Sequence, residues 1–267
     1  MGLTNQSTGI RALEQELKIE RATPNDKIIA LAGNPNVGKS TVFNSLTGLK
    51  QHTGNWPGKT VTNAQGRYRH RDKNFILVDL PGTYSLMANS VEEEVARDFV
   101  CFADPDATVI VADATCLERN LNLVLQTLEI TGRAVVCVNL IDEAKRKRIR
   151  VDIKELSRQL GVPVVGTNAR KGEGLDELMD AVYAVSQSPD DAPIRIEYDE
   201  TVEQAIAIVE PEVNTALQNR LPSRWVALKF LDGGQKLLAA MKKYLGFDLM
   251  DKGEVTAAVE KAQEVLR

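Results

Sequence analysis

The sequence predicts an α/β domain, with a mostly parallel sheet and helices on both faces, followed by a small all-helical domain. Between residues 27 and 186, short apolar runs alternate with helical stripes, which is typical of a parallel sheet covered by its crossover helices. After the Ser-, Pro- and Asp-containing run at 186–193, only helical stripes remain. We therefore divide the 267 residues into an N-terminal extension (1–26), an α/β domain (27–186) and a helical domain (187–267).

The individual elements follow from hydrophobic periodicity. The predicted strands are residues 27–32, 61–70, 74–80, 107–112, 134–140 and 162–165. The predicted helices of the α/β domain are residues 40–47, 90–102, 117–128, 151–160 and 175–182. The helical domain has stripes at 202–217, 225–231, 237–245 and 255–266. A further stripe at 10–17 predicts a short helix in the extension.

Turn and cap residues set several of these limits. Gly48, Gly132 and Gly161 each follow a helical stripe, the usual place for a helix-ending glycine. Ser90 with Glu93 forms a capping box at a helix start. Pro211 falls inside the first stripe of the helical domain, where it predicts a kink or a split.

Residues 51–60 have no hydrophobic period and are rich in Gly, Pro and Asn. This composition predicts a mobile loop, not a strand. We expect the Trp56 side chain in this loop to be exposed.

Composition limits the function classes. The formal net charge of -4 disfavours nonspecific nucleic-acid binding. The cysteines at 101, 116 and 137 have no metal-ligand spacing and are expected to be buried, reduced thiols. No apolar run approaches the roughly 18 residues of a membrane span, and the N-terminus lacks a signal-peptide core. We expect a chain that is soluble and cytoplasmic.

A phosphate-binding loop, Gly-x-x-x-x-Gly-Lys-Ser, links the first predicted strand to the first predicted helix. Strand, glycine loop and helix together direct backbone N–H groups and a helix N-terminus at an anion. Lys39 supplies a charge for the β- and γ-phosphates, and Ser40 a hydroxyl for Mg²⁺. The expected nucleotide contacts here are Gly33, Asn34, Pro35, Asn36, Val37, Gly38, Lys39, Ser40 and Thr41.

Three further motifs, each after a predicted strand, indicate a guanine nucleotide. In Asp79-Leu80-Pro81-Gly82, Asp79 can reach Mg²⁺ through water and the Gly82 N–H can meet the γ-phosphate. In Asn139-Leu140-Ile141-Asp142, the Asp142 carboxylate can accept hydrogen bonds from guanine N1 and N2, donors that adenine lacks on that edge. In Thr167-Asn168-Ala169, a backbone N–H can reach guanine O6.

These motifs predict a Ras-like P-loop GTPase fold for residues 27–186. Thr60 lies in the predicted mobile loop, where it suits the Mg²⁺ contact of the GTP-bound state. An ordinary threonine at a strand start is the alternative for Thr60. A hydrogen bond that only braces the loop is the alternative for Asn36.

The chain resembles the cytosolic N-terminal G-protein part of the ferrous iron transport protein B (FeoB) family. The likeness is carried by Gly33-Asn34-Pro35-Asn36, Gly54-Asn55-Trp56-Pro57-Gly58 with Thr60, Val78-Asp79-Leu80-Pro81-Gly82-Thr83-Tyr84-Ser85 and Leu117-Glu118-Arg119-Asn120-Leu121. The helical tail is similar to that family's GDP-dissociation-inhibitor-like domain.

The resemblance implies a K⁺-activated GTPase that regulates ferrous iron uptake. It implies K⁺ held by Asn36 with the carbonyls of Gly54 and Trp56, so that Asn36, Lys39, Thr60 and Gly82 carry catalysis. It also implies a C-terminal membrane permease domain, small regulatory Feo partner proteins, possible homo-oligomers, no nucleic-acid partner, and a place on the cytoplasmic face of the bacterial inner membrane.

Two departures from commoner GTPases predict modest nucleotide affinity, from Leu140, and slow hydrolysis, from Thr83. Leu140 replaces the lysine that packs on the base in many relatives of Ras. Thr83, not a water-orienting glutamine, follows Gly82, so hydrolysis should be slow.

Two other functions are weighed against this one. A ribosome-assembly or RNA-modification GTPase shares a similar loop and K⁺ dependence but predicts a basic RNA-binding domain, whereas the helical tail is acidic. An ATP-driven motor or kinase predicts no preference for guanine.

Overall fold

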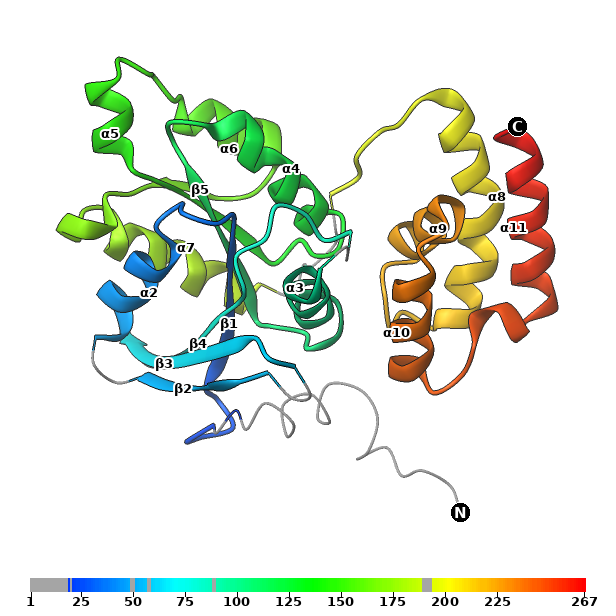
Figure 1. The fold of residues 1–267 in the computed structure, drawn as a ribbon, viewed down its shortest axis with the longest axis horizontal. Coiled ribbons are helices and arrows are strands. Elements are labelled where there is room, and N and C mark those ends of the chain that lie inside the picture. Colours follow the sequence, from blue (N-terminus) through cyan, green and yellow to red (C-terminus); the bar gives the residue numbers. More distant parts are fainter. Residues whose placement is uncertain (1–18, 20, 49–50, 57–58, 88–89, 189–193) are drawn as a thin grey trace. The chain divides into compact units, whose positions relative to one another are not determined.

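The computed structural model describes residues 19, 21–48, 51–56, 59–87, 90–188 and 194–267. The predicted helix at 10–17 lies outside them. The described chain forms two compact units that divide between Ile194 and Arg195, later than the predicted boundary at 186. Figure 1 shows the α/β unit and the helical unit.

The α/β unit contains a seven-stranded sheet in the order β2-β3-β4-β1-β5-β6-β7. The strands are β1 Lys27–Gly33, β2 Gln51–Asn55, β3 Thr62–His70, β4 Lys73–Asp79, β5 Ala107–Asp113, β6 Ala134–Asn139 and β7 Val164–Gly166. Strands β4, β1, β5, β6 and β7 run parallel, while β2 and β3 pair antiparallel. The carboxyl ends of the parallel strands therefore share one edge, where ligands bind in open α/β sheets.

Helices cover both faces of this sheet (Figure 1). One face carries α2 Lys39–Thr47 and α7 Leu175–Gln187. The other carries α3 Val91–Phe102, which packs on β1, and α4 Leu117–Leu128, which packs on β5 and β6. Two further helices, α5 Ile141–Arg146 and α6 Ile153–Leu160, follow β6, and the short 3₁₀ helix Ala169–Lys171 follows β7.

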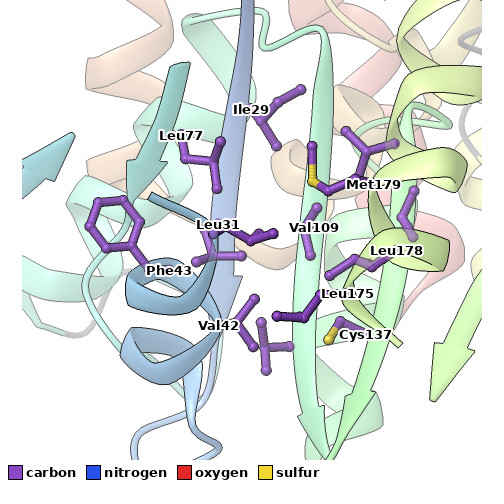
Figure 2. Close-up of a cluster of buried hydrophobic side chains, with 14 of the residues drawn as sticks. Ile29, Leu31, Val42, Phe43, Leu77, Val109, Cys137, Leu175, Leu178 and Met179 are labelled. Carbon is purple, nitrogen blue, oxygen red and sulfur yellow. The ribbon is translucent and has the colours of Figure 1, made fainter. Parts of the chain in front are cut away.

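A hydrophobic core between the sheet and the helices α2 and α7 holds the two elements that flank the phosphate loop. Figure 2 shows Val42 and Phe43 of α2 and Met179 of α7 meeting Leu31 of β1 and Val109 of β5. Neighbouring residues of a strand point to opposite faces, and β1 is buried on both. The loop between β1 and α2 is thus held at both ends by buried elements.

Residues 51–55 form a strand, so the prediction of a loop was wrong there. β2 pairs with β3 along its whole length, from Gln51 opposite Gly66 to Asn55 opposite Thr62. Backbone pairing at a sheet edge needs no hydrophobic period, which is why the pattern missed it.

Trp56 is buried, not exposed as predicted. Its side chain is 5% exposed and its ring packs edge-on against Phe99 of α3, with 5.6 Å between centroids. Lys59 Nζ lies 2.8 Å from Glu94 Oε2 of the same helix. These contacts hold Trp56 and Lys59 against α3.

Other departures are smaller. The helix α5 was not predicted, because six residues are too few to show a period.

Cys101 and Cys137 are buried as expected, and burial raises the pKa of the Cys137 thiol to about 12. Cys116 is exposed, since it caps the start of α4.

The helical unit contains α8 Glu200–Leu217, α9 Ser223–Asp232, α10 Gln235–Leu245, the 3₁₀ helix Leu249–Asp251 and α11 Gly253–Val265. α8 packs on α9 and α11. It runs through Pro211 without a split, because Val209 and Val213 on either side are buried in the bundle. None of the helices in the described ranges is both long and apolar enough to cross a membrane.

Candidate nucleotide-binding site

The phosphate loop connects β1 to α2 and lines a pocket of about 390 Å³. The lining residues are Asn34, Pro35, Asn36, Gly38, Lys39, Ser40, Thr41 and Gly82. Gly38 has φ +82°, and a Cβ there would lie 2.4 Å from Asn139 Nδ2, so only glycine fits. The N-terminus of α2 opens on this pocket, which suits it to an anion.

Lys39 and Asp79 form an ion pair at this site. The Lys39 side chain comes from the first turn of α2 and Asp79 from the end of β4. Burial raises the pKa of Asp79, while the Lys39 ammonium acts in the opposite direction. The two charges predicted to serve the phosphates and Mg²⁺ therefore lie together and neutralise each other in this conformation.

The segment after Asp79 is joined to the phosphate loop by its backbone. Leu80 N donates to Leu31 O at 3.0 Å, and Thr83 N donates to Gly33 O at 3.2 Å. A Cβ on Gly82 would lie 3.4 Å from the Pro35 backbone. Gly82 is thus at the pocket, as its predicted role requires.

Asn139 links the phosphate side to the base side. Its Nδ2 donates to Val37 O at 3.1 Å, and its Oδ1 accepts from Thr167 Oγ1 and Ala169 N, each at 3.1 Å. The side chain is 1% exposed. The predicted nucleotide contact of Asn139 stays a prediction, and in the structure its amide braces the phosphate loop against the loop after β7.

The base-side loops lie beside one another. Ile141 N donates to Thr167 O at 3.2 Å, and Ser45 Oγ of α2 donates to Ala169 O at 3.0 Å. Asp142 is half-buried in the first turn of α5. Leu140 precedes it with φ +63°, a left-handed conformation that turns the chain sharply after β6.

Two N–H groups of the last motif already have partners. Ala169 N donates to Asn139 Oδ1, and Asn168 N donates to Glu173 O at 3.0 Å. Neither is directed at a base in this conformation, although the loop that carries them lies next to Asp142.

Gly54, Trp56 and Thr60 do not line the pocket in the part of the chain that the structure describes. Gly54 is paired with Asn63 in the β2–β3 ladder, and Trp56 packs on α3. Ala64 of β3 lies opposite Asp79, so the turn that contains Thr60 is at the same edge of the sheet as the site. Of the predicted K⁺ ligands, Asn36 lines this pocket, whereas Gly54 and Trp56 are not among its lining residues.

Asn36 does lie at the pocket. It is exposed and has φ +67°, which places an amide beside Lys39 and Gly82 without burying it. Ser40 and Thr41 are exposed there too. Within the described residues, no cluster of three His, Cys, Asp or Glu side chains is placed to hold a metal ion.

Family models match most of the chain. The model "Ferrous iron transport protein B" matches residues 27–182, and the model "FeoB cytosolic helical domain" matches residues 198–267. The chain belongs to the ferrous iron transport protein B family. Membership in the FeoB family displaces the RNA-modification and ribosome-assembly alternative, and it places the helical unit in a known domain family.

Curated FeoB relatives are much longer than this chain. It is 38% identical over 242 residues to the "Fe(2+) transport protein A/Fe(2+) transporter FeoB fusion protein" of Porphyromonas gingivalis, covering 88% of this chain and 29% of that protein. It is 38% identical to the Fe(2+) transporter FeoB of Escherichia coli K12, covering 77% of this chain and 27% of that protein. The chain thus spans less than a third of these relatives.

Solved FeoB cytosolic domains share the fold. The T. maritima FeoB cytosolic domain in a GDP form has a TM-score of 0.74 and 35% identity, covering 90% of this chain and 97% of that one. A variant of S. thermophilus NFeoB bound to GDP has a TM-score of 0.76 and 32% identity, covering 90% of each chain. The predicted G domain followed by a helical domain is confirmed.

Proposed function

We propose that this chain is the GTP-binding and GTP-hydrolysing cytosolic part of a ferrous iron transporter, whose nucleotide state regulates transport. The observation that carries the proposal is the meeting of four strand-end loops. Lys39, Asp79 and Gly82 lie at one pocket, and Asn139 joins it to the loops that hold Asp142 and Thr167.

On the phosphate side, Lys39 exchanges Asp79 for the β- and γ-phosphates when nucleotide binds. The N–H groups of residues 36–40 and the start of α2 surround the phosphates, and the Gly82 N–H faces the γ-phosphate. The bound T. maritima forms with GDP and GMPPNP support nucleotide binding here. Hydrolysis is slow because Thr83 supplies no glutamine amide.

On the base side, Asp142 accepts from guanine N1 and N2. Adenine has no donors on that edge, so binding it would leave the carboxylate unpaired. Asn139 fixes the distance between the two sides by bonding to both, and residues 167–169 close the base pocket.

Two cations suit the residues present. Ser40 and Asp79 offer the hydroxyl and carboxylate oxygens that Mg²⁺ prefers, with Thr60 joining them in the GTP-bound state. Asn36 offers an amide oxygen for K⁺, and the Gly54 and Trp56 carbonyls are the further ligands that we propose. Positive charge here offsets the negative charge that develops on the transferred phosphoryl group.

The partner we propose is the remaining length of the transporter, a membrane permease domain, with this chain at the cytoplasmic face of the inner membrane. A small Feo protein is a second proposed partner, supported by the P. gingivalis relative, whose name joins Fe(2+) transport protein A to FeoB.

A nucleotide titration tests the proposal. The chain should bind a fluorescent GDP analogue that GDP displaces and ADP does not, and Lys39→Ala should lose this binding.

Asp142→Asn should loosen guanine preference and admit xanthine nucleotides, because an amide presents a donor where the carboxylate presented an acceptor. Displacement by ADP as effective as by GDP, or retained affinity in Lys39→Ala, contradicts the proposal.

A further inference from the structure

One polar face of α4 holds the segment that follows Gly82. The Arg119 guanidinium lies 4.2 Å from the centre of the Tyr84 ring. Asn122 Nδ2 donates to Tyr84 O at 3.3 Å, and Leu86 N donates to Gln126 Oε1 at 2.6 Å. We call Arg119, Asn122 and Gln126 the α4 clamp. Their spacing places them along one side of the helix.

The same segment is tied to the phosphate loop at its other end. Thr83 N donates to Gly33 O at 3.2 Å. The Thr83 side chain is buried and its hydroxyl donates to Ser85 O at 2.7 Å. Residues 83–86 therefore run from the phosphate loop to α4 and are anchored at both places.

This anchoring bears on how hydrolysis is achieved without a glutamine. The Thr83 hydroxyl is used within the segment, so its side chain is not free to orient water. The Gly82 N–H is left to face the γ-phosphate, because the Thr83 N–H already donates to Gly33 O. The contribution of a backbone group to the rate depends on its position, because a misplacement of about 1 Å can lower the rate about 100-fold. That position is fixed by the contacts of the segment that carries the group.

We propose that Arg119, Asn122 and Gln126 are positioning residues for GTP hydrolysis, which act by holding residues 83–86 so that the Gly82 N–H faces the γ-phosphate. The inference rests on the proposed GTPase function. It gives a role to the Leu117–Leu121 motif, whose Arg119 touches no residue that lines the pocket.

The side chains of the α4 clamp can be substituted without changing the buried packing of α4. Arg119 and Asn122 are exposed, and Tyr84 is 43% exposed. The buried side of α4, with Leu123 and Val124 fully covered, faces the sheet instead. Variants of the clamp should therefore fold.

The experiment compares Arg119→Ala, Tyr84→Ala and their double variant with the wild type. Each single variant should lower kcat for GTP about tenfold, because the backbone at Gly82 loses its fixed position. GDP affinity should stay within about twofold, since GDP has no γ-phosphate for that backbone to meet. The double variant should lose no more than either single one, because both remove the same contact.

Conservative variants separate positioning from general damage. Tyr84→Phe keeps the ring under Arg119 and should retain the wild-type kcat. Gln126→Glu keeps an acceptor for Leu86 N, whereas Gln126→Leu does not, so only the latter should be slow. Glu118→Gln, one residue away and exposed, is the matched control on the same turn of α4.

An unchanged or raised kcat in Arg119→Ala overturns the inference, and so does a loss of GDP affinity equal to the loss of kcat. The proposed function fails differently. In that case the wild-type chain itself shows no GTP hydrolysis above the Lys39→Ala background.

Discussion

Asn36 has a backbone conformation that decides how its role should be tested. Its φ of +67° is favourable only for glycine and, to a lesser extent, asparagine. An alanine at this position would remove the amide and strain the loop at once. Glycine removes the amide alone.

We therefore predict that Asn36→Gly keeps GDP affinity but loses the gain in GTPase rate that we expect of the wild type when K⁺ replaces Na⁺. The reason is that we propose the amide oxygen of Asn36 as a K⁺ ligand at the pocket. Steady-state hydrolysis in matched K⁺ and Na⁺ buffers measures this. A variant that responds to K⁺ like the wild type would assign Asn36 to loop bracing.

Asn139 bonds to three groups from two loops, and its side chain is fully enclosed. Asn139→Ala should destabilise the nucleotide-free protein by about 1–3 kcal/mol, because Val37 O and Ala169 N lose a buried partner. Thermal unfolding without nucleotide measures this. If unfolding is unchanged while GDP affinity falls, Asn139 contacts the nucleotide directly, as its motif first suggested.

Single residues show where sequence reasoning stops. Lys39, Asp79 and Gly82 were predictable because each motif follows a strand, and parallel strands end at one edge. The ion pair between Lys39 and Asp79 was not predictable from the sequence. A motif indicates which ligand a side chain contacts, but it does not indicate which residue that side chain contacts when the ligand is absent. The contacts of Arg119 and Gln126 with residues 84–86 were equally hidden, since they join segments about 35 to 40 positions apart.

At the scale of elements, long periodic helices were predictable and short or polar elements were not. α4 begins and ends at the predicted residues, and α6 ends at Leu160 before Gly161, whose φ is +66°. β2 has the composition of a loop, yet it forms a strand because β3 offers a free backbone edge. Trp56 was misjudged with it, since only the fold brings Phe99 beneath its ring.

The entry to α8 carries the clearest pH dependence. Arg224 bonds to Glu203 and to Ile196 O, and Tyr198 N also donates to Glu203. The hydrogen bonds from Arg224 are the largest cause that lowers the pKa of Glu203 from its ordinary 4.5 to about 2. Because the folded pKa is the lower one, the stabilisation is complete above about pH 4.5 and is lost as the pH falls toward about 2.

We predict that the helical unit loses stability over this acid range and that Glu203→Gln removes that part of the pH dependence. Unfolding followed by helix content between pH 2 and pH 6 measures it. Arg224→Lys should retain a reduced dependence, because lysine keeps the charge but not the paired geometry. An identical acid profile in the wild type and Glu203→Gln would show that other carboxylates control this transition.

At the scale of the whole molecule, the two units carry separate cores, and the nucleotide site lies in one of them. GDP at about 100 times its dissociation constant should stabilise the α/β unit by about 2.7 kcal/mol. Calorimetry with and without GDP should show one transition that shifts and one that does not. Lys39→Ala should abolish the shift, and a single transition that moves as a whole would show that the units unfold together.

The overall architecture was the most predictable part of the molecule. The alternation of strands and helices indicated the parallel sheet. The point in the sequence where this alternation stops indicated the start of the helical unit. The exact boundary was not readable, because Ile194 N bonds to Leu128 O at 2.9 Å and extends the α/β unit beyond the Ser- and Pro-containing run. That contact joins positions far apart in sequence and leaves no local pattern.

The ion pair between Lys39 and Asp79 makes phosphate and divalent cation thermodynamically interdependent. A diphosphate that takes the Lys39 ammonium leaves a half-buried carboxylate with no counter-ion, and the cost of that uncompensated charge disappears only if a cation arrives with it. Reciprocity then requires each to tighten the other by the same factor. If phosphate and Mg²⁺ bind at these two side chains as we propose, we expect each to bind weakly without the other.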